Sequence, residues 1–114
     1  MKSKTLTRSK WQSVLDQFSK IEADAMATVL VGGDALGAQT EAEDVRFFGI
    51  SYDPKDDSVS IEVEGLDHRI SGPAEIEIAF DGIDVTSIEV KGAENLKHIV
   101  SFKPAIRFPL VAEL

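Results

Sequence analysis

The sequence has 114 residues, 43% hydrophobic and 28% charged, a composition typical of one soluble globular domain. Twenty acidic residues against twelve basic ones give a net charge of −8, which argues against nucleic-acid binding because that binding needs basic side chains to neutralise phosphates. The lack of cysteine excludes disulfides and thiol catalysis, and no apolar window approaches the roughly 20 residues that a membrane helix needs.

The basic residues gather at the start of the chain. The first twenty residues carry five basic groups and one acidic group, whereas the rest carries seven basic and nineteen acidic groups. No apolar run follows this basic start, so the sequence shows no secretory signal, and we expect a cytoplasmic protein of bacterial type.

A helix is predicted over residues 7–20. Its apolar residues Trp11, Val14, Leu15 and Phe18 follow the i, i+3, i+4, i+7 spacing of a single helix face. Thr7 is a natural N-cap. We expect the apolar face to dock onto a sheet.

Beyond residue 23 the apolar residues alternate with polar ones, which is typical of β-strands with one buried face. The expected strands are 25–31, 37–44, 45–52, 58–64, 66–71, 75–80, 85–91 and 96–102. The ranges 37–44 and 45–52 form one long run, bent or bulged around Gly49. Short connections favour antiparallel neighbours. We therefore predict a single α+β domain, 1–114, with one N-terminal helix packed on a mostly antiparallel sheet or half-open barrel of about seven strands.

The last segment of the chain is apolar but poorly suited to regular structure. Pro104 and Pro109 exclude a helix interior and a central strand position. Its apolar residues must be covered either by the edge of the same domain or by a second subunit; they are Ile106, Phe108, Leu110 and Val111.

The stretch "EGLDHRISGP" holds the candidate ligand-binding residues. In a strand over 66–71, His68 lies on the apolar face, and Asp67 and Arg69 lie on the other. The histidine is then either a structural residue or an acid, base or ligand with a tuned pKa. Arg69 can pair with an anion, and Tyr52 can add an apolar ring with a hydroxyl.

His98 has the same placement in its own strand, between Leu96 and Val100. The two histidines can meet across neighbouring strands, and a carboxylate beside them would complete a two-histidine, one-carboxylate metal site. No H-x-x-x-H spacing supports such a site, so the favoured interpretation contains no metal, no cofactor and no catalytic residue.

The segments "KTLTRSKWQSVLDQFSK", "GISYDPKDD" and "EGLDHRISGPAEI", followed by "SIEV" and "HIVSF", resemble a family of small uncharacterised bacterial proteins, a domain of unknown function. Its patterns here are LTRSxWQ, YDPKDD and EGLDH, and the resemblance covers Leu6 to about Phe102. The resemblance implies a bacterial source, a single domain and a helix followed by strands. It implies no activity and no functional residue.

Two functions follow as hypotheses. The favoured one is a non-enzymatic binding or interaction module that self-associates or binds another protein, because no catalytic spacing is recognisable and the C-terminal apolar segment needs cover. The alternative is a small-molecule or metal-binding site centred on Asp67, His68 and Arg69. Neither hypothesis involves nucleic acid or a membrane.

Overall fold

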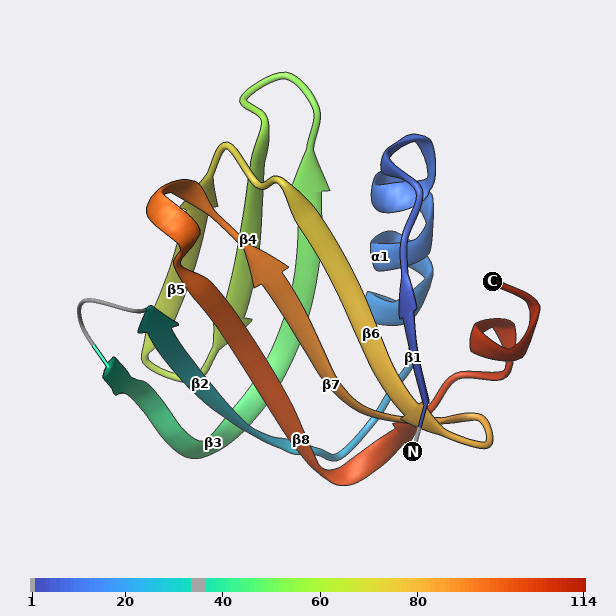
Figure 1. Cartoon of the computed structure of the whole chain (residues 1–114). Helices are drawn as coiled ribbons and strands as arrows, with labels where there is room; N and C mark the ends of the chain where they lie inside the picture. The colour runs from blue at the N-terminus through green and yellow to red at the C-terminus, as the bar shows by residue number, and fades with distance from the viewer. Residues whose placement is uncertain (1, 34–36) are drawn as a thin grey trace.

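The computed structural model describes residues 2–33 and 37–114 (Figure 1). Within them the chain forms one α-helix, α1 (Trp11–Ser19), and eight strands. The strands are β1 (Lys2–Thr5), β2 (Met26–Gly33), β3 (Gly37–Asp53), β4 (Ser58–Val63), β5 (Leu66–Ser71), β6 (Glu75–Asp81), β7 (Asp84–Lys91) and β8 (Lys97–Arg107). Short 3-10 turns cover Arg8–Lys10, Ala93–Asn95 and Pro109–Glu113.

All strand pairs in the described part of the chain are antiparallel, in the order β1-β6-β7-β8-β2-β3-β4-β5. β3 is 17 residues long: its first half pairs with β2 and its second half with β4. Register shifts interrupt its pairing on both sides, including one between Phe47 and Gly49, and the strand bends strongly. The sheet curls without closing, so the predicted α+β class is confirmed, with eight strands in place of about seven.

Three local features differ from the sequence prediction. β1 has no alternation, since all four of its residues are exposed, and it forms a strand only by pairing with β6. The first turn of the helical region is 3-10, and Thr7 makes no side-chain capping hydrogen bond within the described residues. β8 continues past Pro104 because the proline lies where pairing with β7 skips from Ser101 to Ile106.

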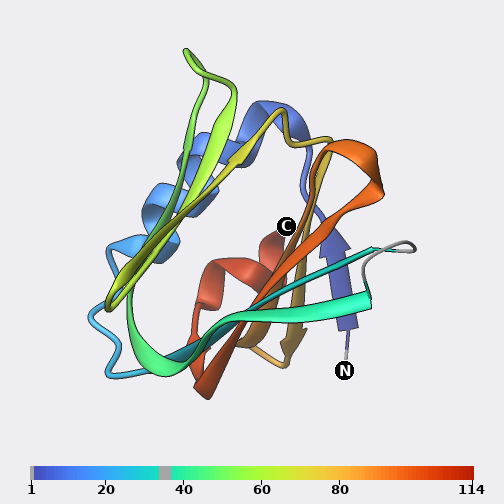
Figure 2. The same cartoon turned by 90° about the vertical axis from the view of Figure 1, so that its left-hand side faces the viewer.

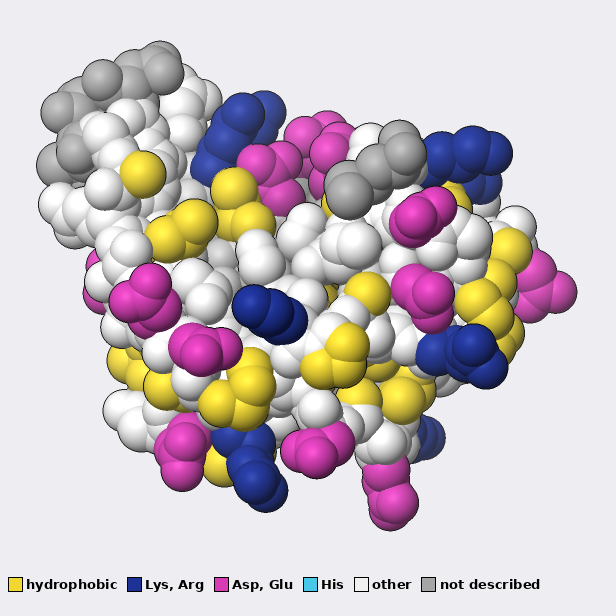
Figure 3. Space-filling view, turned by 90° about the horizontal axis from the view of Figure 1, so that it is seen from below, with side chains coloured by type: hydrophobic (Ala, Val, Ile, Leu, Met, Phe, Trp, Pro, Cys, Tyr) yellow, Lys and Arg dark blue, Asp and Glu magenta, His cyan; other side chains and the backbone are white. Residues whose placement is uncertain are grey.

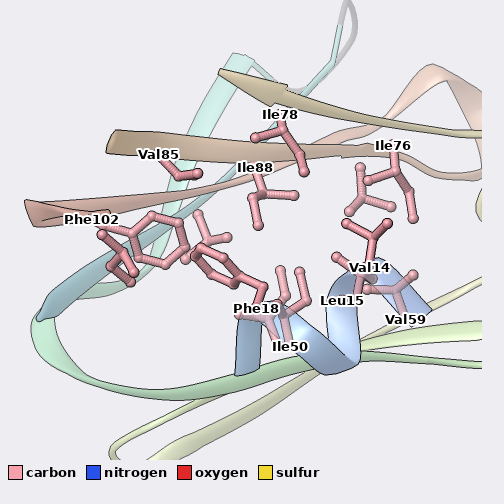
Figure 4. Packing of buried hydrophobic residues seen from close by; sticks show 14 of the residues in the cluster. Val14, Leu15, Phe18, Ile50, Val59, Ile76, Ile78, Val85, Ile88 and Phe102 are labelled. Atoms are coloured by element: carbon pink, nitrogen blue, oxygen red, sulfur yellow. The ribbon is translucent and has the colours of Figure 1, made fainter. Parts of the chain in front are cut away.

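The core lies between α1 and the concave face of the sheet. Trp11, Val14, Leu15 and Phe18 are at most 3% exposed, as the apolar spacing of the helix predicts. Val14, Leu15 and Phe18 point toward apolar side chains from strands on both arms of the bent sheet, among them Ile50, Ile76 and Ile88 (Figure 4). The curl of the sheet around this layer is clearest in the second view (Figure 2).

The C-terminal segment is covered by its own chain. Ile106, Phe108 and Val111 are 3%, 4% and 0% exposed. The Phe108 ring packs edge-on against Phe18, with 5.3 Å between centroids. These residues therefore complete the core and do not require a second subunit.

The lower face of the molecule carries side chains of all three kinds, acidic, basic and apolar (Figure 3). Seen from below, acidic, basic and apolar side chains are interspersed, and no histidine is visible on this face (Figure 3). Among the described residues, no helix is long and apolar enough to cross a membrane. Phe48 is the large hydrophobic residue left exposed, at 57%, in the described part of the chain.

Replacing Phe18 tests this account of the core. We expect Phe18→Ala to lower the free energy of unfolding by about 3–5 kcal/mol, because it removes a ring buried against three other aromatic rings. Urea denaturation followed by circular dichroism measures the change. The matched control, Phe48→Ala, should change it by less than about 0.5 kcal/mol. Equal losses of unfolding free energy in the two variants would contradict the assignment of Phe18 to the core.

Candidate functional site

His68 and His98 meet although their strands are not neighbours in the sheet. Nε2 of His68 lies 2.9 Å from Nδ1 of His98, and the ring centroids are 5.1 Å apart. His68 stands on β5, at one end of the strand order, and His98 stands at the start of the central strand β8. The curl of the sheet therefore brings an end strand against a central one, through side chains.

Gly92 and Ile70 continue this contact. A Cβ atom on Gly92 would lie 3.1 Å from His98 Nε2 and 3.2 Å from Ile70 Cγ2, so the glycine permits the close approach. We call the line formed by His68, Ile70, Gly92 and His98 the seam. Both imidazoles are half-buried there.

Strand alternation explains why both histidines point into the seam. His68 shares the inner face of β5 with the buried Ile70, and His98 shares the inner face of β8 with the buried Val100. Each imidazole therefore replaces an apolar residue at the rim of the core.

Burial lowers the pKa of both imidazoles. For His68, burial is opposed by the negative charges of Glu41 and Asp67. For His98, burial and the charge of His68 lower the pKa, and Glu41 opposes them. The contact needs one neutral ring to accept the N–H of the other, so the neutral form, which is also the metal-binding form, is favoured.

Glu41 lies on β3, close to the row of paired residues that contains His98. In the strand register His98 pairs with Val31, and Val31 pairs with Gln39. Glu41 is two residues beyond Gln39 on β3, at the register shift between the pairs Leu30–Thr40 and Val29–Ala42. Its side chain is exposed, and its charge acts on both rings.

As the side chains stand, no three histidine, aspartate or glutamate residues among 2–33 and 37–114 are grouped closely enough to hold a metal ion. The seam therefore offers two imidazole nitrogens and a carboxylate nearby, but not a formed three-ligand site.

The other predicted site residues lie away from the seam. Asp67 and Arg69 are on the exposed outer face of β5. Arg69 Nη2 donates to Asp56 Oδ2 at 2.9 Å, and both groups are more than half exposed. The structure thus divides the predicted segment Asp67, His68 and Arg69 between two faces of one strand.

Tyr52 belongs to a second cluster. Its hydroxyl donates to Asp57 Oδ1 at 2.7 Å, and its ring packs edge-on against Trp11, with 5.2 Å between centroids. Arg8 donates from Nη1 to Tyr52 and Asp57, at 3.4 and 3.3 Å, and from Nη2 to the Pro73 carbonyl at 2.9 Å. The cluster ties the start of the helical region to two sheet connections.

The pKa shifts of Asp57 and Tyr52 support a structural role for the cluster that they form with Arg8. The hydrogen bond from Tyr52 and the charge of Arg8 hold the pKa of Asp57 below its usual value, while the bond to Asp57 raises the pKa of Tyr52. Asp57 is therefore ionised and Tyr52 neutral near pH 7. Strand alternation and motif spacing do not indicate Arg8 and Asp57 as partners of Tyr52, although the patterns LTRSxWQ and YDPKDD contain them.

Fold and contacts together define a small α+β protein with a curled, open antiparallel sheet and a histidine pair across its seam. The chain belongs to the family of unknown function DUF5335, whose sequence profile matches residues 2–111. It is 34% identical over 110 residues to an uncharacterised protein of Aquifex aeolicus (strain VF5), covering 96% of this chain and 99% of that protein. No solved structure matches significantly. The expected membership of an uncharacterised family with bacterial members is thereby confirmed.

The histidine pair predicts a pH dependence of stability. Folding lowers the pKa of both histidines. As the pH falls below about 6.5, the unfolded chain therefore takes up protons at a higher pH than the folded chain does. The free energy of unfolding should be highest above that pH, should decrease as the pH falls, and should level off once the imidazoles of the folded protein are also protonated. Urea denaturation between about pH 7.5 and pH 5 measures this.

The control is the double variant His68→Gln, His98→Gln, which removes both histidines of the sequence. Its stability should vary less over this range, and Glu41 and Asp67 remain in it as in the wild type. Identical slopes in the two proteins would show that the histidines do not cause the effect.

Proposed function

We propose that the chain is a small non-enzymatic binding module that takes a divalent transition-metal ion at the seam. The observation that carries the proposal is the distance of 2.9 Å between His68 Nε2 and His98 Nδ1. The two residues are thirty positions apart in the sequence and lie on different strands. A tetrahedral zinc ion with bonds of about 2.0–2.1 Å to nitrogen would hold two nitrogens about 3.3 Å apart. A small separation and turn of the rings would therefore admit the ion.

The chemistry of the rings supports the same ligand class. Neutral imidazole suits Zn²⁺, Cu²⁺ and Ni²⁺, whereas Ca²⁺ and Mg²⁺ prefer oxygen. Burial lowers the pKa of both rings and so favours the metal-binding form at neutral pH. The net charge of −8 and the acids beside the seam favour a cation over an anion.

Zinc-dependent stabilisation tests this function. At zinc concentrations about 100 times the dissociation constant, the wild-type free energy of unfolding should rise by about 2.7 kcal/mol. His68→Gln and His98→Gln should each lose most of this gain. Denaturation at constant pH measures it, on protein without a histidine tag, since the sequence then holds only these two histidines.

A control separates the seam from weak binding to surface acids. Glu77→Gln, on β6, removes a carboxylate on the face opposite the buried Ile76 and Ile78, whereas the histidines lie on the inner face, and should keep the full zinc effect. Equal zinc stabilisation of the wild type and the double histidine variant would rule the proposal out.

Self-association is a second candidate, supported by the open ends of the sheet. β1 and β5 end the strand order, and an end strand offers unpaired backbone groups to a second copy. The C-terminal apolar residues no longer support it, because they are buried in their own chain.

The mass of the protein in solution tests whether the chain self-associates. Light scattering across protein concentrations should show a dimer at high concentration, and a monomer throughout would contradict it. Deleting 104–114 is not a suitable probe, because the deletion also removes the core residues Ile106, Phe108 and Val111.

A further inference from the structure

We infer that two copies of this chain pair through β5, antiparallel and about a two-fold axis at His68, so that Asp67 of each copy faces Arg69 of the other. This inference rests on the second candidate of the proposed function, self-association, and does not depend on metal binding. It adds the strand, the register and the charges that would hold the dimer together.

The hydrogen bonds between β4 and β5 show which backbone groups of β5 are already used. The pairing of the two strands has no register shift, and just beyond it the Gly72 N–H donates to the Asp57 carbonyl at 2.9 Å. In an antiparallel ladder, hydrogen-bonded pairs alternate with non-bonded pairs. Every second residue before Gly72 therefore directs its backbone groups toward β4, namely Ile70, His68 and Leu66.

The residues between them form the free edge of the strand. The backbone groups of Asp67, Arg69 and Ser71 point away from β4, and their side chains are exposed. In the described part of the chain β5 ends the strand order and pairs with β4 alone, at the end of the arm β3-β4-β5 (Figure 1). This edge can therefore accept a further strand.

The charges on the edge select one register for a second copy. Pairing centred on Asp67 or on Arg69 places two like charges opposite each other, which is destabilising. Pairing centred nearer either end of β5 leaves one of the two charges beyond the opposing strand. Pairing centred on His68 places Asp67 opposite Arg69 twice, and each of these pairs exchanges both of its N–H···O bonds. Opposite charges in such a position stabilise the sheet.

The surroundings of the two residues fit the same arrangement. Glu62 lies opposite Asp67 on β4, so Arg69 of the second copy would approach two carboxylates. Arg69 already donates to Asp56 of its own chain at 2.9 Å, but both groups are more than half exposed. Such an exposed ion pair contributes little, and a guanidinium has five N–H donors, so Arg69 can also bind the second carboxylate.

β1, at the other end of the strand order, does not favour this pairing. The Leu6 N–H donates to the Ile76 carbonyl at 2.8 Å, so by the same alternation Ser3 and Thr5 carry the outward backbone groups of β1. An antiparallel pairing of two copies that uses both residues places Lys4 opposite Lys4. Short end strands that carry lysine resist edge-to-edge pairing.

Sedimentation equilibrium at neutral pH, with a metal chelator present, tests the inference. Asp67→Arg and Arg69→Asp should each weaken dimerisation at least about tenfold, because both opposite-charge pairs become like-charge pairs. An equimolar mixture of these two variants should recover the dimer, since the facing charges are then opposite again. The matched control is Lys2→Asp on β1, which changes the net charge as Arg69→Asp does and should keep the wild-type dissociation constant.

Amide hydrogen exchange locates the interface. At concentrations where the dimer forms, the amides of Asp67 and Arg69 should exchange more slowly than in the monomer, whereas those of Ser3 and Thr5 should exchange at the same rate in both. Circular dichroism should show the same fold for all variants, because every substituted residue is exposed.

The possible failures can be told apart. A wild type that is monomeric at every concentration overturns self-association and this inference together. If a dimer forms but both charge variants form it equally well, or their mixture stays monomeric, self-association stands and the pairing of β5 is overturned. Growth beyond a dimer also overturns it, because pairing of β5 with β5 closes after two copies.

Discussion

The structure depends on burying one short apolar helix from both sides. The helix α1 has nine residues, and a helix of this length is not stable in water without tertiary contacts. Phe18 contacts rings from three different segments: Phe47 on β3, Phe102 on β8 and Phe108 near the C-terminus. Covering the helix requires the sheet to curl, and the curl in turn carries β5 toward β8. The histidine contact is thus a consequence of core packing.

Much of the fold could be predicted from local periodicity. The spacing of the apolar residues identified the helix, and alternation identified which side of β5 and β8 each histidine occupies. β1 could not be found this way, because Lys2–Thr5 has no buried residue and its only strand partner in the described part of the chain, β6, is more than seventy residues away. The C-terminal segment was ambiguous for a related reason, since apolar residues show that cover is needed and do not show what supplies it.

The site was harder to predict than the fold. Alternation alone separates His68 from Asp67 and Arg69, but it cannot show that His68 reaches His98, because that contact depends on strand order and on the bend of β3. Tyr52 was singled out for its chemistry, yet its partners are Arg8 and Asp57. Glu41 lies in a polar run whose residues show no alternation, so its position follows only from the register of β2 and β3.

The position of β8 has a consequence for how the chain folds. β8 is the last strand in chain order among the described residues, yet it lies between β7 and β2 in the middle of the sheet. Without residues 97–107, the strand pairs of the sheet fall into two groups that β8 joins, β2-β3-β4-β5 and β1-β6-β7. Each half-sheet exposes an unpaired strand edge that pairs with β8 in the finished protein, and exposed edges promote aggregation. A chain in which β8 has not yet paired therefore exposes both of these edges at once.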